Sequence, residues 1–464
     1  MGIKVEVLSL VLLITLVTIF TLALIKKQQR NISFIHPGWV LVVVIFFYAV
    51  MVPIAYLVFG DNLHKVYSGV YNQFYDSNFI KVMCMYLAST VGFLYAQTLL
   101  GILKNIRSGT NLSSKKQETT LNPIKKKLLN RIIFILPIIG LYFIYARYAA
   151  IGGFYSAFAL NRRDLAAAVA ESGVFTRWEY FFQVYFILSF ALVLNSSYRK
   201  RKRIVLTLIL VFYIFYLLLS GVRLPIIVLL LGLFFVFYSS TIKTIVKDKY
   251  RIFIFEFWRN NKKRIIVFGL LVFMFFSWYA FQRVTIRSSL IGQEVAFSEV
   301  SLGELMFPAE FGTGYVPGLL ILNNSWTDLG SVYWQKFIPS SILSFIGFQP
   351  NITVSKELAW NLHGVGRSAV YTITLPIDIF SATNSYIMIF VISSILYLMF
   401  YFIFKKLSRY GFWGNSFSAL LFLNLYYVVR VEASNWFPRM WQGGLVLFII
   451  MIIYLILRKG RLRT

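Results

Sequence analysis

Four arginines of this 464-residue chain lie at, or within one turn of, the predicted ends of long apolar segments. They are Arg147, Arg223, Arg283 and Arg430. A guanidinium group stays charged when it is partly buried, and it grips phosphate or carboxylate through two parallel hydrogen bonds. Because charged groups at membrane depth usually face a cavity and mark a functional path, the four predict an anion site at head-group height. A lipid-linked phosphate or pyrophosphate suits this position. The alternative for each single arginine is that it reaches the lipid head groups or pairs with a nearby acid.

Candidate general bases occur in the same parts of the chain. His363 stands in NLHGVGRS, four residues before Arg367. A histidine can accept a proton from a sugar hydroxyl near neutral pH; the alternative is a structural hydrogen-bonding role in a loop. Asp378, Glu432 and Asp164 are further candidates, and spacing does not single out one of them.

Aromatic and amide side chains near these residues suit carbohydrate. Sugars present apolar C–H faces and hydroxyl edges, which match flat aromatic rings and the paired donors and acceptors of amides. We assign Trp360, Asn361 and Trp436 to sugar binding. The alternative is an interfacial belt of aromatic residues, which explains most of the aromatic content.

Motifs of nucleotide-dependent and metal-dependent chemistry are absent from the sequence. It has no Walker loop, no dinucleotide-binding glycine motif, no HExxH and no DxD. Its single cysteine, Cys84, allows neither an internal disulfide nor a cysteine-based metal site. We therefore expect no cofactor and no metal. The donor substrate would arrive already activated, as a lipid pyrophosphate does.

Membrane-spanning helices must position these residues. Hydrophobic residues make up 59% of the chain, and apolar runs of about 20 residues, long enough to cross a bilayer, recur along its length. We predict an all-α polytopic membrane protein, a single integral membrane domain over residues 1–464. Its eleven predicted spans are 7–25, 39–59, 80–103, 131–149, 180–195, 204–220, 224–240, 265–282, 382–404, 413–429 and 443–457.

The distribution of charge predicts which way the spans run. One set of alternate loops and terminal segments holds 31 of the 46 Lys and Arg residues and three of the 17 acids. Since positive loops stay cytoplasmic, the amino terminus is predicted periplasmic and the carboxyl terminus cytoplasmic. The net charge of +29 then reflects topology and contact with anionic lipid, not nucleic acid. Ten of the 15 bases on the other side are arginines, which adds Arg162, Arg163 and Arg367 to the anion-binding candidates.

The largest predicted loop, residues 283–381, lies on the outer side between the eighth and ninth spans. Pro, Gly, Asn and aromatic residues are dense in it, and no β-strand alternation persists. We expect short helices and turns lying over the membrane. The apolar piece VPGLLIL, residues 316–322, is too short to span and is predicted to be re-entrant or interfacial.

The chain resembles the O-antigen polymerases of bacteria, the Wzy-type oligosaccharide repeat-unit polymerases. The resemblance covers most of its length. It depends on the number of spans, the long loop late in the chain and the mid-chain turn LLLSGVRLP at 217–225. Two outer segments also carry it: GGFYSAFALNRRD at 152–164 and YYVVRVEASNWFPR at 426–439.

The resemblance implies a metal-independent C-type glycosyltransferase of the bacterial inner membrane. Such an enzyme joins undecaprenyl-pyrophosphate-linked oligosaccharide repeat units at the periplasmic face, moving the growing chain onto the non-reducing end of a new unit. By the same resemblance, Arg223 and Arg430 hold the donor pyrophosphate, and a base such as His363 activates the acceptor hydroxyl. The arginines that would assist are Arg147, Arg162, Arg163 and Arg367. A chain-length regulator (a co-polymerase) is the protein partner that the family suggests.

Three other functions compete with polymerisation. An O-antigen ligase shares the layout and moves finished polymer onto the lipid A core. A flippase for the lipid-linked repeat unit would need polar residues near mid-membrane and repeated halves, whereas these spans are nearly free of charge. A membrane acyltransferase would expose a histidine near an early helix, but His36 is cytoplasmic in this topology and His64 lies in a short outer loop.

Overall fold

The computed structural model describes residues 2–29, 35–59, 77–107, 123–150, 179–194, 200–219, 226, 228–236, 313–323, 373–430 and 433–460. Within these residues every regular element is a helix, and there is no β-strand. Five stretches are long and apolar enough to cross a membrane: Lys4–Gln29, Ser77–Lys104, Lys127–Ala146, Tyr386–Arg430 and Met440–Arg458. Three shorter apolar helices accompany them: Gly38–Ile54, Tyr180–Val193 and Ile204–Ile214. The described part of the chain is thus an all-α assembly of several candidate transmembrane helices.

Most predicted spans coincide with helices. Seven of them match α1 (Gly2–Gln29), α2 (Gly38–Phe59), α4 (Ser77–Arg107), α9 (Glu179–Leu194), α10 (Lys200–Leu219), α18 (Tyr386–Leu407) and α19 (Gly411–Arg430). The short 3-10 helix η5 (Ser408–Tyr410) joins α18 to α19. Residues 228–236 are helical inside the predicted span 224–240. The predicted span 265–282 lies outside the described residues.

Two predicted spans differ from the observed helices in their bounds. The span 131–149 is divided between α5 (Pro123–Ile133) and α6 (Ile135–Ala150), which meet at a turn at Phe134. The last span, predicted from residue 443, is α20 (Ala433–Gly460), which begins well before it. Its first turns carry polar and aromatic residues that precede the apolar run, although they belong to the same helix.

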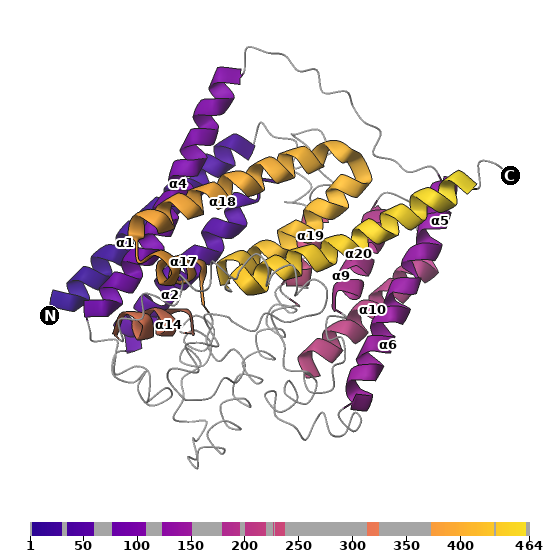
Figure 1. The fold of residues 1–464 in the computed structure, drawn as a ribbon, viewed down its shortest axis with the longest axis horizontal. Coiled ribbons are helices and arrows are strands. Elements are labelled where there is room, and N and C mark those ends of the chain that lie inside the picture. Colours follow the sequence, from indigo (N-terminus) through magenta and orange to yellow (C-terminus); the bar gives the residue numbers. More distant parts are fainter. Residues whose placement is uncertain are drawn as a thin grey trace.

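Helices α1, α2, α4 and α18 pack into one bundle (Figure 1). α4 and α18 run in the same direction, because residues later in α4 contact residues later in α18. Ser89 Oγ lies 2.8 Å from Ser393 Oγ, and further along, Tyr397 donates to Gln97 Oε1 at 2.7 Å. Gly92 permits this approach, since a Cβ there would lie 2.6 Å from a backbone carbonyl oxygen of α18. Small residues commonly allow membrane helices to pack this closely.

A buried polar cluster joins these helices at one end of the bundle. Gln97 of α4 hydrogen-bonds both Tyr397 and Gln28, which lies in the last turn of α1. The ring of His36, just before α2, lies 5.5 Å from that of Tyr397. Burial lowers the pKa of His36 to about 3, so its imidazole is neutral near pH 7 and its Nδ1 accepts the N–H of Gly38 at 3.0 Å. We call Gln28, His36, Gln97 and Tyr397 the His36 cluster.

The substitution Gly38→Ala is expected to destabilise the chain by about 1–3 kcal/mol, the usual cost of overpacking a filled interior. A Cβ at position 38 would lie 2.1 Å from the hydroxyl oxygen of Tyr397, which its hydrogen bond to Gln97 holds in place. Thermal unfolding of detergent-solubilised protein measures the difference. Gly101→Ala is the matched control, because its added carbon would meet no heavy atom of the described residues within 4 Å beyond its chain neighbours and the backbone of its own helix. Equal melting temperatures for the two variants would contradict the packing at Gly38.

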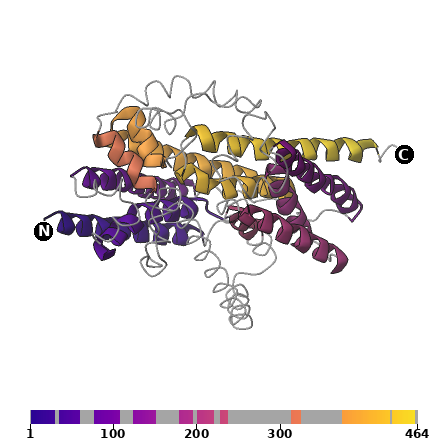
Figure 2. The same cartoon turned by 90° about the horizontal axis from the view of Figure 1, so that it is seen from below.

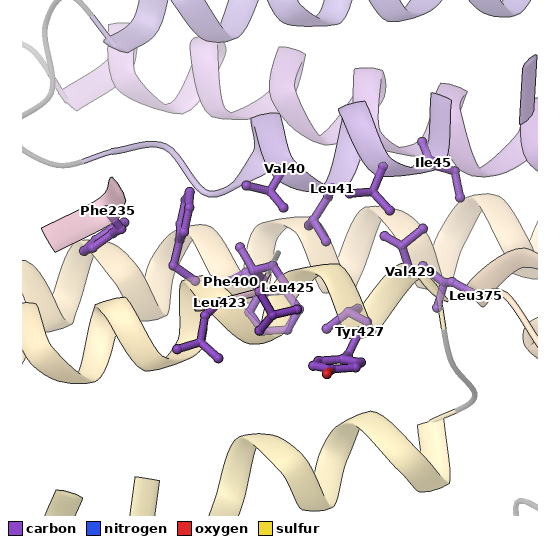
Figure 3. Packing of buried hydrophobic residues seen from close by; sticks show 14 of the residues in the cluster. Val40, Leu41, Ile45, Phe235, Leu375, Phe400, Leu423, Leu425, Tyr427 and Val429 are labelled. Atoms are coloured by element: carbon purple, nitrogen blue, oxygen red, sulfur yellow. The ribbon is translucent and has the colours of Figure 1, made fainter. Parts of the chain in front are cut away.

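The helices α5, α6, α9, α10, α19 and α20 form a second group on the other side of the molecule (Figures 1 and 2). Aromatic rings fill its interior. Phe182 of α9 stacks on Tyr213 of α10 at 4.8 Å, and Gly140 of α6 leaves room for the Phe182 ring. α19 links the two groups, because Phe422 lies 5.6 Å from Trp39 of α2. Figure 3 shows apolar residues of α2 facing those of α19 along this contact.

Basic residues gather at the end of the bundle that holds the His36 cluster. Lys26 and Lys27 lie in the last turn of α1, and Lys405 and Lys406 lie in the last turn of α18. The hydrogen bonds of Gln97 bring these two helices together at this end. Helix ends that the charge pattern assigns to one face therefore meet at one end of the bundle.

Candidate functional site

Two short helices from the 283–381 segment lie at the opposite end of the bundle. They are α14 (Thr313–Asn323) and α17 (Leu375–Thr383), beside the first turns of α4 (Figure 1). The parts of this segment that the structure describes thus contain two short helices, while their expected position over the membrane stays a prediction. VPGLLIL forms much of α14, where Leu319, Leu320 and Ile321 are buried. Protein covers these side chains, which is compatible with both the re-entrant and the interfacial alternative.

Polar contacts attach α14 and α17 to the long helices. Tyr86 OH of α4 lies 2.9 Å from Thr374 Oγ1, directly before α17. Tyr315 of α14 donates its hydroxyl to the carbonyl oxygen of Ala49 in α2 at 2.7 Å, and its ring stacks on Tyr86 with centroids 5.0 Å apart. Gly314 makes the junction possible, because a Cβ there would lie about 3 Å from three neighbouring side chains. Four separate segments of the chain thus converge on one small, buried region.

Asp378 lies in the first turn of α17. It is the one acid among the buried side chains that the structure describes, with 2% of its surface exposed. Its backbone N–H donates to the carbonyl oxygen of Thr374 at 2.9 Å, and Ser381 donates to its carbonyl oxygen at 2.8 Å. A carboxyl group is costly to bury, and ionisable groups kept at membrane depth usually have a functional reason. The position therefore keeps Asp378 as a candidate catalytic residue.

Arg430 ends α19 close to α17. Its neighbour Val429 is fully buried and lies beside Leu375 of α17 and Ile45 of α2 (Figure 3). Asp378 follows Leu375 by one helical turn, so a predicted anion ligand and a predicted base come from adjoining elements. Arg430 as a residue is half-buried, and its guanidinium carbon lies over the ring of Tyr426, 5.8 Å from the ring centroid. A cation held over an aromatic face is oriented without losing its charge.

Two further predicted site residues are described only by their backbone position. Trp436 lies in the first turn of α20, shortly after the end of α19. Arg147 lies in the last turn of α6, and that end of α6 lies far from α17 in both views (Figures 1 and 2). Trp436 follows Arg430 closely in the sequence, whereas the structure does not bring Arg147 beside Asp378.

The remaining predicted site residues lie outside the described residues. They are the arginines Arg162, Arg163, Arg223, Arg283 and Arg367, the candidate bases His363, Glu432 and Asp164, and the candidate sugar-binding residues Trp360 and Asn361. Among the residues that are described, no group of three or more His, Cys, Asp or Glu side chains could hold a metal ion.

The structure adds residues that the sequence did not suggest. Tyr86, Thr374 and Tyr315 connect α17 to the bundle, yet Tyr86 stands inside an apolar span where it resembles any other aromatic residue. The sequence feature that could have located the start of α17 is the run Thr374-Leu375-Pro376. A threonine followed closely by a proline commonly marks a helix start, and that is where α17 begins.

No protein-family model, no curated protein and no solved structure matches this chain. A functional assignment therefore depends on its own residues and geometry.

Proposed function

We propose that this chain is a metal-independent glycosyltransferase of the bacterial inner membrane. It polymerises undecaprenyl-pyrophosphate-linked oligosaccharide repeat units at the periplasmic face, as the Wzy-type polymerases that it resembles do. In this proposal it has eleven spans, with the amino terminus periplasmic and the carboxyl terminus cytoplasmic. The basic ends of α1 and α18 support that orientation, since Lys26, Lys27, Lys405 and Lys406 would face the cytoplasm.

The observation that carries the proposal is the adjacency of α17 and the end of α19. A half-buried arginine, Arg430, and a buried acid, Asp378, therefore stand on helices that contact each other, at the end of the bundle away from Lys26, Lys27, Lys405 and Lys406. One is suited to hold a phosphate and the other to accept a proton. In this proposal both residues face the outer side, where transfer from a lipid pyrophosphate would use one of each kind.

The reaction exchanges one bond at the anomeric carbon for another. The C–O bond between the growing chain and the lipid pyrophosphate breaks, and the acceptor hydroxyl of a new unit forms the glycosidic bond. Its proton passes to the base, which we assign to Asp378, with His363 and Glu432 as the alternatives. Undecaprenyl pyrophosphate leaves with the bonding electron pair, and guanidinium groups such as Arg430 and Arg223 offset that charge.

Transport fits the described residues less well than one-sided chemistry. A transporter needs charged or polar groups at mid-membrane. Buried polar groups such as Ser89 and Ser393 do lie within the long helices. The one buried acid that the structure describes, however, lies in a short helix at one end of the bundle, and that acid is what favours one-sided chemistry. An O-antigen ligase would use the same outer arrangement, so it stays the second candidate.

Reconstitution tests the proposal and separates these functions. The purified chain is placed in liposomes with the undecaprenyl-pyrophosphate-linked repeat unit from the bacterium that makes it. A polymerase converts this single substrate into a ladder of lipid-linked products and releases undecaprenyl pyrophosphate. A ligase yields product only when lipid A core is added, and a flippase moves the lipid without covalent change. Absence of a ladder from well-folded protein would overturn the polymerase assignment.

A further inference from the structure

Thr374 occupies the N-cap position of α17 but does not cap it. Its backbone is extended (φ −81°, ψ 159°), as for a normal N-cap, yet its side chain makes no cap hydrogen bond. A capping threonine usually accepts a backbone N–H of the first turn. Here Thr374 Oγ1 pairs instead with the hydroxyl of Tyr86 in α4, at 2.9 Å. The threonine therefore attaches its helix to a neighbour rather than stabilising the first turn of that helix.

The partner hydroxyl is itself held rigidly. Tyr86 is fully buried, and its ring stacks on Tyr315 with an interplanar angle of 19°. Tyr315 is fixed in turn by its hydrogen bond to the carbonyl oxygen of Ala49 in α2. A Cβ at Gly314 would lie 3.1 Å from the Tyr86 hydroxyl and 3.0 Å from a methyl group of Thr374, so no larger residue fits without movement. The position of the Thr374 side chain is therefore determined by two long helices and by α14.

Thr374, which makes this attachment, is also hydrogen-bonded to the backbone of Asp378. The carbonyl oxygen of Thr374 accepts the N–H of Asp378 at 2.9 Å, the first hydrogen bond of α17. Any shift of Thr374 relative to α4 therefore moves the turn that carries the carboxyl group. A misplacement of about 1 Å between reacting groups can lower a rate by about 100-fold.

We propose that Tyr86 and Thr374 are positioning residues, whose hydrogen bond sets where the Asp378 carboxyl group stands relative to the acceptor hydroxyl. The inference rests on the proposed function for its catalytic part. Neither residue touches substrate in this scheme. Their effect passes through the backbone of α17, with Tyr315 as the support for Tyr86.

Two substitutions remove the hydrogen bond with little change of shape. Tyr86→Phe keeps the stacked ring, and Thr374→Val keeps the branched side chain. In the liposome assay each variant should lower kcat about tenfold with KM unchanged, and the double variant should lose no more than either one, because both delete the same bond. Thr374→Ser retains the hydroxyl and should recover most of the rate.

Ser89→Ala is the matched control for loss of a buried hydroxyl. Ser89 lies in α4, close to Tyr86 along the chain, and its 2.8 Å contact joins α4 to Ser393 of α18 rather than to α17. It should leave kcat unchanged while lowering the melting temperature as much as Tyr86→Phe does. A Tyr86→Phe variant with wild-type kcat, or one no slower than Ser89→Ala, would overturn the positioning role.

Hydrogen exchange separates failure of this inference from failure of the proposed function. The amide of Asp378 should exchange faster in Tyr86→Phe and Thr374→Val than in the wild type or in Ser89→Ala, whether or not the protein makes polymer. If the wild type makes no polymer, the polymerase assignment falls, together with the catalytic part of this inference. If the wild type is active but exchange and kcat are both unchanged in the variants, the inference alone falls.

Discussion

Replacing Arg430 with alanine is expected to slow polymer formation by about 100-fold or more while the chain remains folded and inserted. A preorganised donor aimed at developing negative charge typically contributes about 10²–10³-fold to a rate, and the leaving pyrophosphate concentrates that charge. Arg430 is held for this task at the end of α19, half-buried and over the ring of Tyr426. The ladder of polymer on lipopolysaccharide gels, from a deletion strain carrying each variant, measures the loss. Arg223→Ala is expected to show the same defect.

Controls for the Arg430 substitution come from the same part of the chain. Arg409 is an exposed arginine in η5, directly before the other end of α19. Arg409→Ala removes an equal charge at the proposed cytoplasmic face and should leave the ladder intact. Arg430→Lys keeps the charge but loses the two-pronged grip on phosphate, so its rate should fall between those of the wild type and the alanine variant. Full ladders from both Arg430→Ala and Arg223→Ala would remove the pyrophosphate-binding assignment.

Much of the helical framework could be predicted from the apolar runs of the sequence, but the amphipathic helix α5 could not. These runs located α1, α2, α4, α18 and α19 closely, because burial in lipid demands long apolar segments. α5 was missed for a physical reason. It is amphipathic, with Leu128, Leu129 and Ile132 buried against protein while Lys127 and Arg131 are exposed. Such a helix is specified by the spacing of its apolar residues and not by an unbroken apolar run.

Only those residues of the candidate site that are unusual in their own sequence surroundings could be predicted. Arg430 and Asp378 were found because a charge beside an apolar span is conspicuous without any knowledge of its partners. The contact between Tyr86 and Thr374 joins residues 288 positions apart. Neither residue is unusual in its own surroundings, and their relation exists only once α17 packs on α4. A local sequence pattern therefore cannot predict a contact between residues so far apart in the chain.

Asp378→Asn is expected to reduce kcat by about 10²–10⁴-fold, the usual contribution of a positioned general base. Asparagine keeps the size of the side chain and its capacity to accept hydrogen bonds, so the buried turn of α17 should survive and KM should change little. Steady-state rates in liposomes, with circular dichroism and melting temperature as checks on folding, give the measurement. Asp378→Ala should lose the same activity and also some stability, since it leaves a void in a buried helix.

Ser381→Ala distinguishes loss of the base from mere disturbance of α17. Ser381 is buried in the same helix and donates to the carbonyl oxygen of Asp378 at 2.8 Å. Its removal perturbs the helix without touching the carboxyl group, so it should cost stability and at most a few-fold in rate. If Asp378→Asn retains wild-type kcat while His363→Ala or Glu432→Ala abolishes it, then the proton is accepted elsewhere. In that case the burial of Asp378 serves packing of α17 against the bundle, and the arginine at the end of α19 would work with a base from another segment.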